Sequence, residues 1–272
     1  MKKLLARILV RVGLGLTTAK KLATLRSSQE ELFVLKSSNF NSKISKYFSG
    51  EDIYRALAEI RNSRAQMHQD LIALLLLDFK PSGYFVEFGA SDGIQFSNSM
   101  LLESEYGWTG ILAEPGKKWH KQLKNNRNSF VETKCVWKSS GEVLVFNETE
   151  VGELSTLEMF SSSDFHGSYR ISGNRYNVET ISLIDLLDKY KAPFDIDYLS
   201  IDTEGSELQI LESFNFDKYK FKFISCEHNY TENRELIRSL IESKGYVRVL
   251  EDMSLFDDWF VDRSLAKSKG LI

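Results

Sequence analysis

The stretch Tyr84–Gly93 reads Y-F-V-E-F-G-A-S-D-G and is the strongest indication of the fold. A short apolar run that contains one acid is followed directly by a turn bounded by two glycines, and residues 94–105 then have the polarity of a helix. Glycines let a ligand approach the backbone where a strand passes into a helix, and the helix N-terminus offers free N–H groups. The stretch therefore predicts the first strand, turn and helix of an α/β domain with a ligand at the turn.

A second acid follows at a spacing that is typical of ribose recognition. Residues 109–113 form another apolar run, which ends at Glu114, 22 residues after Asp92. An acid about 20 residues beyond a glycine turn binds ribose hydroxyls in dinucleotide folds. Gly89 and Gly93 are four residues apart and no third glycine opens the helix, which argues against a pyrophosphate and an NAD-dependent oxidoreductase. S-adenosylmethionine, with a ribose but no phosphates, fits better, unless the turn is an ordinary one with surface acids.

The composition is that of an ordinary globular protein. Of 272 residues, 42% are hydrophobic and 27% are charged, which suits one large α/β domain plus an extension. We expect a helical N-terminal extension over residues 1–80 and the catalytic domain over residues 81–272. The two cysteines favour buried thiols in a reducing compartment, hence a cytoplasmic protein.

Residues 1–26 carry seven lysines and arginines and no acid, with apolar residues at helical spacing between them. The arginines interrupt the apolar run, so this segment is neither a secretory signal nor a transmembrane span. One interpretation is an amphipathic helix that contacts the inner membrane peripherally. The other is a helix docked on its own domain or on a second subunit of a homo-oligomer. Nothing in the sequence indicates a nucleic-acid partner.

Beyond residue 81, predicted strands and helices alternate, which favours a mainly parallel sheet with helices on both faces. Residues 246–250 and 259–261 are expected to form an antiparallel hairpin at the end of the chain. The predicted strands are residues 84–88, 109–113, 129–136, 143–146, 178–182, 197–201 and 221–226 together with that hairpin. The predicted helices are residues 96–106, 117–126, 183–190, 206–214 and 232–244. Ligands of such sheets bind beyond the carboxyl ends of the strands.

Four segments at those strand ends resemble one family. They are F-V-E-F-G-A-S-D-G (85–93), G-I-L-A-E-P (110–115), I-D-Y-L-S-I-D-T-E-G-S-E (196–207) and C-E-H-N (226–229). Over about residues 81–263 the chain is similar to FkbM-type S-adenosylmethionine-dependent methyltransferases. The resemblance implies a Rossmann-like class I methyltransferase fold with a seven-stranded sheet, and O-methylation of hydroxyls, commonly on sugars or polyketide-like compounds. The chain departs from the family pattern at Ser91 and Thr203, where Asn and Val are frequent.

The resemblance and the positions of the strand ends together indicate which residues bind the cofactor. The family pattern implies that Glu87, Gly89, Asp92 and Gly93 line the methionine and ribose, and that Glu114 binds the ribose. The full set of expected cofactor-binding residues is Glu87, Phe88, Gly89, Ala90, Asp92, Gly93, Glu114, Pro115, Cys135 and Val136.

Methyl transfer to a hydroxyl needs alignment and removal of a weakly acidic proton. His228 is the expected base, oriented by the neighbouring Glu227, with Asp202 as the third catalytic residue. Alternatively, Asp202, Glu227 and His228 hold Mg²⁺, which prefers oxygen ligands. Residues 151–177 form a long segment rich in aromatics and arginines, expected either to bind sugar or act as a lid, or to pack on itself.

The function that we predict from the sequence is O-methylation of a sugar hydroxyl, in bacterial surface-glycan or related biosynthesis. The alternative is a non-catalytic nucleoside-binding module that docks a membrane or glycan-assembly complex. The acids at the strand ends favour the enzyme, because a pure binder has no need of Asp202, Glu227 and His228 together.

Overall fold

The computed structural model describes Glu30, Val34 and residues 37–272, so the basic segment 1–26 and its predicted helix lie outside the described residues. The chain divides into two compact units, and the boundary falls between Lys46 and Tyr47. In the first unit, residues 37–44 are helical. No helix of the described part of the chain is long and apolar enough to cross a membrane.

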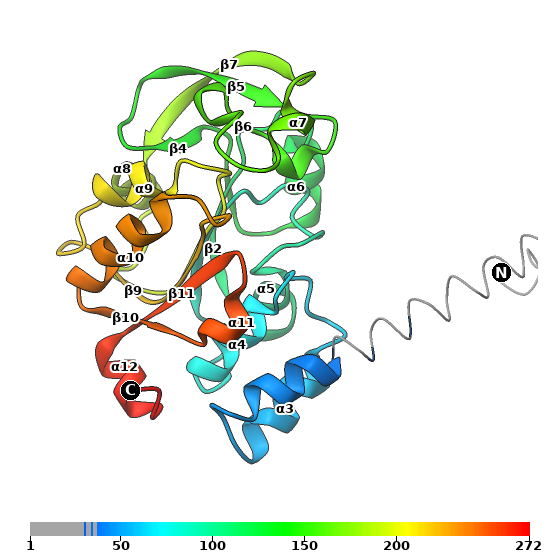
Figure 1. Cartoon of the computed structure of the whole chain (residues 1–272), viewed down its shortest axis with the longest axis vertical. Helices are drawn as coiled ribbons and strands as arrows, with labels where there is room; N and C mark the ends of the chain where they lie inside the picture. The colour runs from blue at the N-terminus through cyan, green and yellow to red at the C-terminus, as the bar shows by residue number, and fades with distance from the viewer. Residues whose placement is uncertain (1–29, 31–33, 35–36) are drawn as a thin grey trace, which may run out of the picture. The chain divides into compact units, whose positions relative to one another are not determined.

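The second unit contains a seven-stranded sheet in the order β10-β11-β9-β8-β1-β2-β3 (Figure 1). β11 runs antiparallel to both of its neighbours, and the other pairs are parallel. The predicted fold class, an α/β protein with a mainly parallel sheet, is confirmed. The strands are β1 (Tyr84–Phe88), β2 (Thr109–Ala113), β3 (Phe130–Glu132), β8 (Asp195–Ile201), β9 (Lys220–Glu227), β10 (Tyr246–Val249) and β11 (Asp257–Asp262).

The central strands are apolar on both sides, as strands covered by helices on two faces must be. On one face, Val86 and Leu199 of the sheet pack in one core with Leu186, Ile210 and Ile241 from three helices. These helices are α8 (Leu183–Lys189), α9 (Glu207–Glu212) and α10 (Asn233–Ser243), and α4 (Gln69–Leu76) and α5 (Met100–Tyr106) lie across the sheet from them (Figure 1). The remaining helices are α3 (Glu51–Glu59), α6 (His120–Asn126), α7 (Gly167–Arg170), α11 (Glu251–Ser254) and α12 (Arg263–Ser268), and the 3-10 turns are η1 (Gly152–Leu154) and η2 (Glu158–Phe160).

All eight residues of α4 are buried, although an apolar helix of this kind was expected to belong to an N-terminal extension. Its side chains cover the sheet, and α3 packs against it. Both helices therefore belong to the same compact unit as the sheet, and this unit starts at Tyr47.

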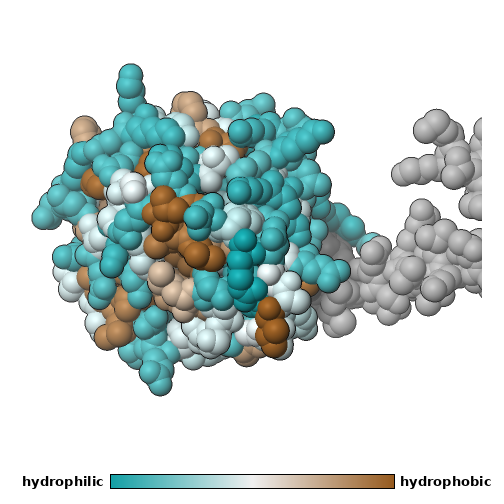
Figure 2. All heavy atoms as spheres, turned by 90° about the horizontal axis from the view of Figure 1, so that it is seen from above, coloured by the Kyte–Doolittle hydropathy of each residue, from teal (hydrophilic) through white to brown (hydrophobic). Residues whose placement is uncertain are grey.

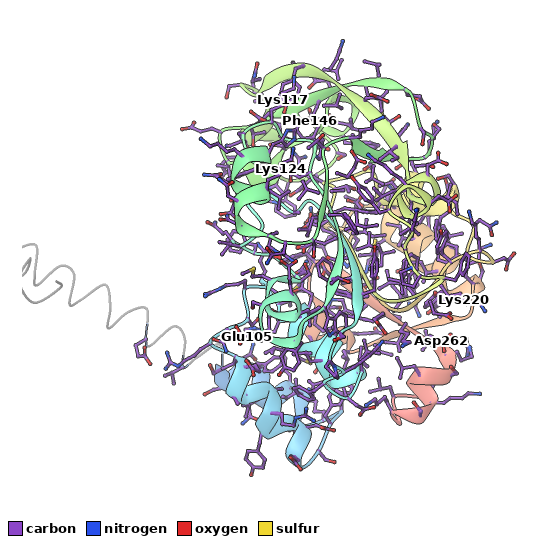
Figure 3. The ribbon with its side chains drawn as sticks, turned by 180° about the vertical axis from the view of Figure 1, so that it is seen from behind. Glu105, Lys117, Lys124, Phe146, Lys220 and Asp262 are labelled. Atoms are coloured by element: carbon purple, nitrogen blue, oxygen red, sulfur yellow. The ribbon has the colours of Figure 1, made fainter. Side chains whose placement is uncertain are left out.

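A second sheet has four strands in the order β4-β7-β5-β6. Phe146 of this sheet lies near the top of Figure 3, whereas Lys220, at the start of β9, lies lower and at one side. Seen from above, the molecule shows a patch of apolar side chains within a largely hydrophilic surface (Figure 2). The strands are β4 (Cys135–Trp137), β5 (Val143–Glu148), β6 (Thr156–Leu157) and β7 (Asn174–Ser182).

The strand predicted over residues 129–136 is in fact two strands, β3 and β4, which belong to different sheets. The side chain of Glu132 accepts hydrogen bonds from the main-chain N–H groups of Thr133 (2.9 Å) and Lys134 (3.1 Å). These bonds fix a turn between the two strands. The chain thereby leaves the main sheet and starts the second one directly above the strand ends.

Candidate active site

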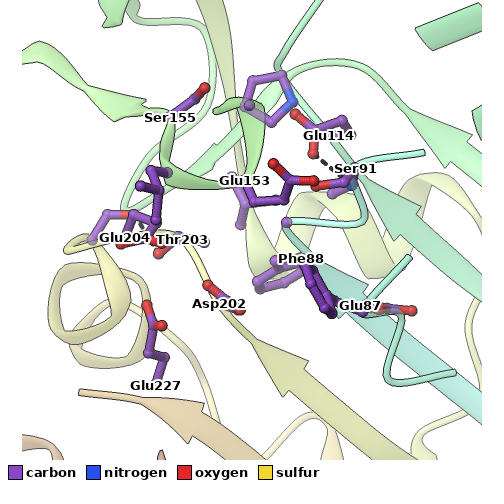
Figure 4. Close-up of a pocket in the computed structure, with 18 of the residues that line it drawn as sticks. Glu87, Phe88, Ser91, Glu114, Glu153, Ser155, Asp202, Thr203, Glu204 and Glu227 are labelled. Carbon is purple, nitrogen blue, oxygen red and sulfur yellow. Dashed lines mark hydrogen bonds between the residues drawn. The ribbon is translucent and has the colours of Figure 1, made fainter. Parts of the chain in front are cut away.

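A cavity of about 320 Å³ lies beyond the carboxyl ends of β1, β2, β8 and β9, where a sheet of this kind binds its ligands. Its walls come from the main sheet, from β4 to β6 of the second sheet, and from loops of both (Figure 4). The lining residues are Gln66, Glu87, Phe88, Gly89, Ser91, Gln95, Phe96, Asn98, Ala113, Glu114, Pro115, Cys135, Val136, Phe146, Gly152, Glu153, Leu154, Ser155, Leu157, Phe165, His166, Asp202, Thr203, Glu204, Ser206, Glu227, Asn229 and Phe256.

Glu114, at the end of β2, faces this cavity as the predicted ribose ligand would. Its two carboxylate oxygens accept hydrogen bonds from the main-chain N–H groups of Ser91 (2.8 Å) and Gly116 (2.6 Å). Burial raises the pKa of Glu114 to about 7. A carboxylate has about four acceptor positions, so about two of them remain for a ligand.

Glu87 lines the cavity, but its carboxylate is used inside the protein. Oε1 accepts a hydrogen bond from the main-chain N–H of Asn98 at 2.7 Å, and Oε2 accepts bonds from the hydroxyls of Ser97 and Ser99. The fully buried guanidinium of Arg127 lies 3.8 Å from Oε2. Figure 4 shows the side chain pointing away from Asp202 and Glu114. The geometry gives Glu87 the role of holding the loop after the turn, and its predicted contact with the cofactor stays a prediction.

Three predicted cofactor residues, unlike Glu87, do not line the cavity. Asp92 accepts bonds from the N–H groups of Ile94 and Gln95, both at 2.8 Å, and so stabilises the turn itself. Gly93 packs against Arg127 and leaves no space there for a β-carbon. Ala90 is buried beneath the turn. The other predicted cofactor residues, which are Phe88, Gly89, Glu114, Pro115, Cys135 and Val136, do line the cavity, as does Glu87.

Asp202, Glu204 and Glu227 bring one carboxylate oxygen each within 4.8 Å of one another. Asp202 follows β8 and points into the cavity, and Glu227 ends β9 beside it (Figure 4). Burial, together with the nearby Glu207, raises the pKa of Asp202 to about 7. Burial and then Asp202 also raise the pKa of Glu227 well above its ordinary value. Two adjacent carboxyl groups in a poorly hydrated site repel each other when both are charged. One of them therefore keeps its proton, and its pKa rises.

His228 is not part of this group, although the sequence places it next to Glu227. His228 directly follows the last residue of β9, and it is not among the residues that line the cavity. Its Nδ1 accepts a hydrogen bond from the main-chain N–H of Tyr230 (3.0 Å), and its Nε2 lies 3.5 Å from Asp258. This position does not support the predicted roles of His228 as general base or metal ligand. Glu204 takes the third place in the cluster instead.

The sequence indicated residues 151–177 as a candidate functional segment, but it did not indicate which of their side chains line the cavity. Glu153 to Ser155, Phe165 and His166 come from the long aromatic segment, which was the one available signal for them. Gln66 comes from a segment before the first predicted strand, and Phe256 from the connection of the predicted terminal hairpin. Asn98 follows the glycine turn, and no motif distinguishes it from its neighbours.

Several lining residues have a backbone conformation that side chains disfavour. Ser91, Phe96, Glu204 and Asn229 have φ of 46°, 59°, 59° and 44°. Residues other than glycine adopt this left-handed region at a cost, and they concentrate at functional sites. Their grouping around one cavity supports its assignment as the active site.

A parallel sheet with a carboxylate-lined cavity beyond its central strands defines a Rossmann-like protein with a small-molecule site. This chain belongs to the FkbM methyltransferase family: the family model described as the methyltransferase FkbM domain matches residues 87–248, more than half of the chain. No curated protein matches the chain. Among solved structures, a precorrin-6y C5,15-methyltransferase from Geobacter metallireducens GS-15 is similar, with 12% identity and a TM-score of 0.37 over 66% of this chain and 70% of that chain.

Proposed function

We propose that this methyltransferase transfers a methyl group from S-adenosylmethionine to a hydroxyl of a sugar, in bacterial surface-glycan or related biosynthesis. The observation that carries the proposal is the Asp202–Glu227 pair, which faces a cavity whose opposite wall presents Glu114. Glu114 is suited to binding the hydroxyls of a ribose, and the Asp202–Glu227 pair is suited to accepting a proton from the sugar hydroxyl.

The cavity fits the cofactor by its chemistry. Glu114 retains acceptor positions for ribose hydroxyls. Pro115, Val136, Phe146 and Leu157 provide apolar surface of the kind that an adenine ring contacts. When bound, S-adenosylmethionine supplies an activated methyl group, so that the protein needs to align the acceptor and remove its proton.

Asp202 is the group that we assign to proton removal. Burial and the neighbouring Glu207 raise the pKa of Asp202 above its ordinary value and towards neutrality, which suits a general base. Glu227 beside it can share the proton once it is transferred. Mg²⁺ is the alternative, because Asp202, Glu204 and Glu227 offer oxygen ligands. Glu204 already binds Arg170 at 2.7 Å, which favours proton transfer over a metal site.

The sugar part of the proposal rests on two aromatic side chains. Phe96 and Phe165 line the cavity, and they are 45% and 65% exposed. One follows the glycine turn and the other belongs to the segment above the strand ends, so the rings are supplied by separate parts of the chain. Exposed aromatic rings beside a polar cavity suit a ring with an apolar C–H face and hydroxyls at its edge. A pyranose has both.

The location and assembly of the protein are further parts of this proposal. We propose a cytoplasmic enzyme that reaches an anionic inner-membrane surface through residues 1–26, with homo-oligomerisation as the other use of that basic segment. Sedimentation of the full chain with anionic vesicles, released by salt, supports the membrane contact. Loss of an oligomer after deletion of residues 1–26, without vesicle binding beforehand, supports the second use.

The decisive experiment measures cofactor binding and methyl transfer separately. We expect S-adenosylhomocysteine to bind in calorimetry, and labelled S-adenosylmethionine to transfer methyl groups to one member of a panel of mono- and oligosaccharides. Asp202→Asn should bind S-adenosylhomocysteine and lose the transfer. If S-adenosylhomocysteine binds but no acceptor in the panel is methylated, and Asp202→Asn does not change that binding, the non-catalytic module is favoured. No binding at all would overturn the proposal.

A further inference from the structure

Arg170 is the most completely buried charged side chain above the cavity, with none of its surface exposed. Three of its contacts lie within residues 152–170, which we call the capping segment. Nε donates to the carbonyl of Leu154 at 2.8 Å, and Nη1 lies near the carbonyl of Phe160 (3.4 Å) and 2.9 Å from the carboxylate of Asp164. The guanidinium therefore organises the capping segment from inside.

The remaining nitrogen of Arg170 reaches out of the capping segment. Nη2 donates to Oε2 of Glu204 at 2.7 Å, across 34 residues of sequence. Asn229 donates to the same oxygen at 3.2 Å. Glu204 belongs to the loop after β8, has a left-handed φ of 59°, and lines the cavity beside Asp202. One charge-assisted bond thus joins the capping segment to the loop that presents the catalytic acid.

Two further contacts join the same two parts of the chain. The hydroxyl of Thr156 donates to the carbonyl of Glu204 at 2.8 Å. Gly205 packs so closely against Phe160 that a β-carbon would lie 3.0 Å from its side chain. The capping segment is therefore seated directly on residues 203–205.

We propose that Arg170 is a positioning residue which, through Glu204, holds the capping segment closed over the bound cofactor. This inference rests on the proposed use of S-adenosylmethionine. The capping segment supplies Glu153, Leu154, Ser155, Phe165 and His166 to the cavity, and these residues remain there only while the segment is seated. Arginine suits the role because its planar fork satisfies several fixed acceptors at once, which a lysine cannot do.

The first test measures how fast S-adenosylhomocysteine leaves the full-length protein, by stopped-flow and calorimetry. The Arg170–Glu204 pair holds the capping segment and not the cofactor itself, so its loss should act through easier opening of that segment. We expect dissociation from Arg170→Met to be faster by about tenfold or more, and Arg170→Lys to recover part of the loss. The matched control is Arg175→Met. Arg175 pairs with Glu158 at 3.0 Å at a half-exposed site and does not reach Glu204, so the rate should stay within about twofold.

A double-mutant cycle shows whether Arg170 acts through Glu204. If it does, Arg170→Met combined with Glu204→Gln should speed dissociation little more than the stronger single variant, because both remove the same contact. Independent, multiplicative effects would overturn the proposal. Equal dissociation from the wild type and Arg170→Met would also overturn it, and would leave the proposed function intact.

Two further measurements test the role of Arg170 even if Arg170→Met fails to fold. In the wild type, hydrogen exchange of residues 152–170 and 203–207 should slow together when S-adenosylhomocysteine binds. Thr156→Val removes one seating contact while Arg170 stays in place, and should speed dissociation severalfold. Unchanged exchange in the capping segment would overturn the proposal. Failure of the wild type to bind S-adenosylhomocysteine would overturn the proposed function, and the role of Arg170 with it.

Discussion

Gly89 lies against the main-chain carbonyl of Asp202, so closely that a β-carbon at position 89 would be 2.1 Å from that oxygen. The glycine was expected to make room for a ligand. Its contact with Asp202 gives it a second role, which is to let the ends of β1 and β8 approach each other. The turn at Gly89 and the proposed base at Asp202 are therefore parts of one tightly packed unit.

We expect Gly89→Ala to be destabilised by at least about 2 kcal/mol and to lose binding of S-adenosylhomocysteine, because Asp202 must move. Gly141→Ala is the matched control. Gly141 has a similar left-handed φ, 80° against 71°, but nothing lies within 4 Å of its β-carbon position. Denaturant unfolding of both variants separates the steric contact from the backbone strain. Equal destabilisation would show that the approach of β1 to β8 is not the limiting feature.

Glu114→Gln should weaken S-adenosylmethionine binding by about 1–3 kcal/mol in calorimetry. The amide retains one acceptor but replaces the other with a donor that faces N–H groups and ribose hydroxyls. Thermal melting of the unliganded variant reports the loss of the bonds from Ser91 and Gly116 separately. Wild-type affinity in a folded variant would remove Glu114 from the cofactor site.

Glu87→Ala should act on stability before it acts on binding. The substitution leaves buried donors at Ser97, Asn98 and Ser99 without their acceptor and removes a carboxylate near the buried Arg127. Losing one member of a buried charge pair costs about 3–5 kcal/mol. Glu179→Ala, which breaks the exposed pair with Lys134, is the control and should cost under about 1 kcal/mol. A stable Glu87→Ala variant with selectively weakened cofactor binding would restore the role predicted from the sequence.

Asp257 gives a stability effect that depends on pH. Burial raises its pKa to about 7, although Gln69 and Trp259 donate hydrogen bonds to it. A carboxyl whose pKa is higher in the folded state binds more protons there, so its contribution is complete below the unfolded pKa near 4 and is lost as pH rises towards 7. The stability of wild type relative to Asp257→Asn should fall over that window by on the order of 2–4 kcal/mol. A difference that does not vary with pH would contradict the shift.

The local patterns of the sequence predicted the central strands well. Residues 84–88 and 109–113 coincide with β1 and β2, because a buried strand between a glycine turn and a polar segment is specified by neighbouring residues. The terminal hairpin was found for the same reason. The second sheet was missed, since the side chain of Glu132 divides one apolar run between two sheets.

The site was harder to predict because its contacts join distant parts of the chain. Arg170 donates a hydrogen bond to Glu204, 34 residues further along the chain, and no local sequence pattern predicts that contact. The left-handed backbone of Phe96 also has no signal in residue type, whereas Asn229 is a residue type that adopts this conformation more readily than most. His228 follows Glu227 directly, but its ring accepts a hydrogen bond from Tyr230 and lies beside Asp258, so adjacency in sequence did not place it in the cavity.

The last prediction separates Asp202 from His228. Asp202→Asn should lower the turnover number by about 10²–10⁴-fold with little change in cofactor affinity, since it removes the proposed base. His228→Ala should lower stability, because Tyr230 loses an acceptor and the ring beside Asp258 is removed, while the turnover number stays within about tenfold of wild type. Turnover should not change with a chelator. A loss on chelation that Mg²⁺ restores would make Asp202, Glu204 and Glu227 metal ligands, and a large loss of turnover in a folded His228→Ala variant would return the base to His228.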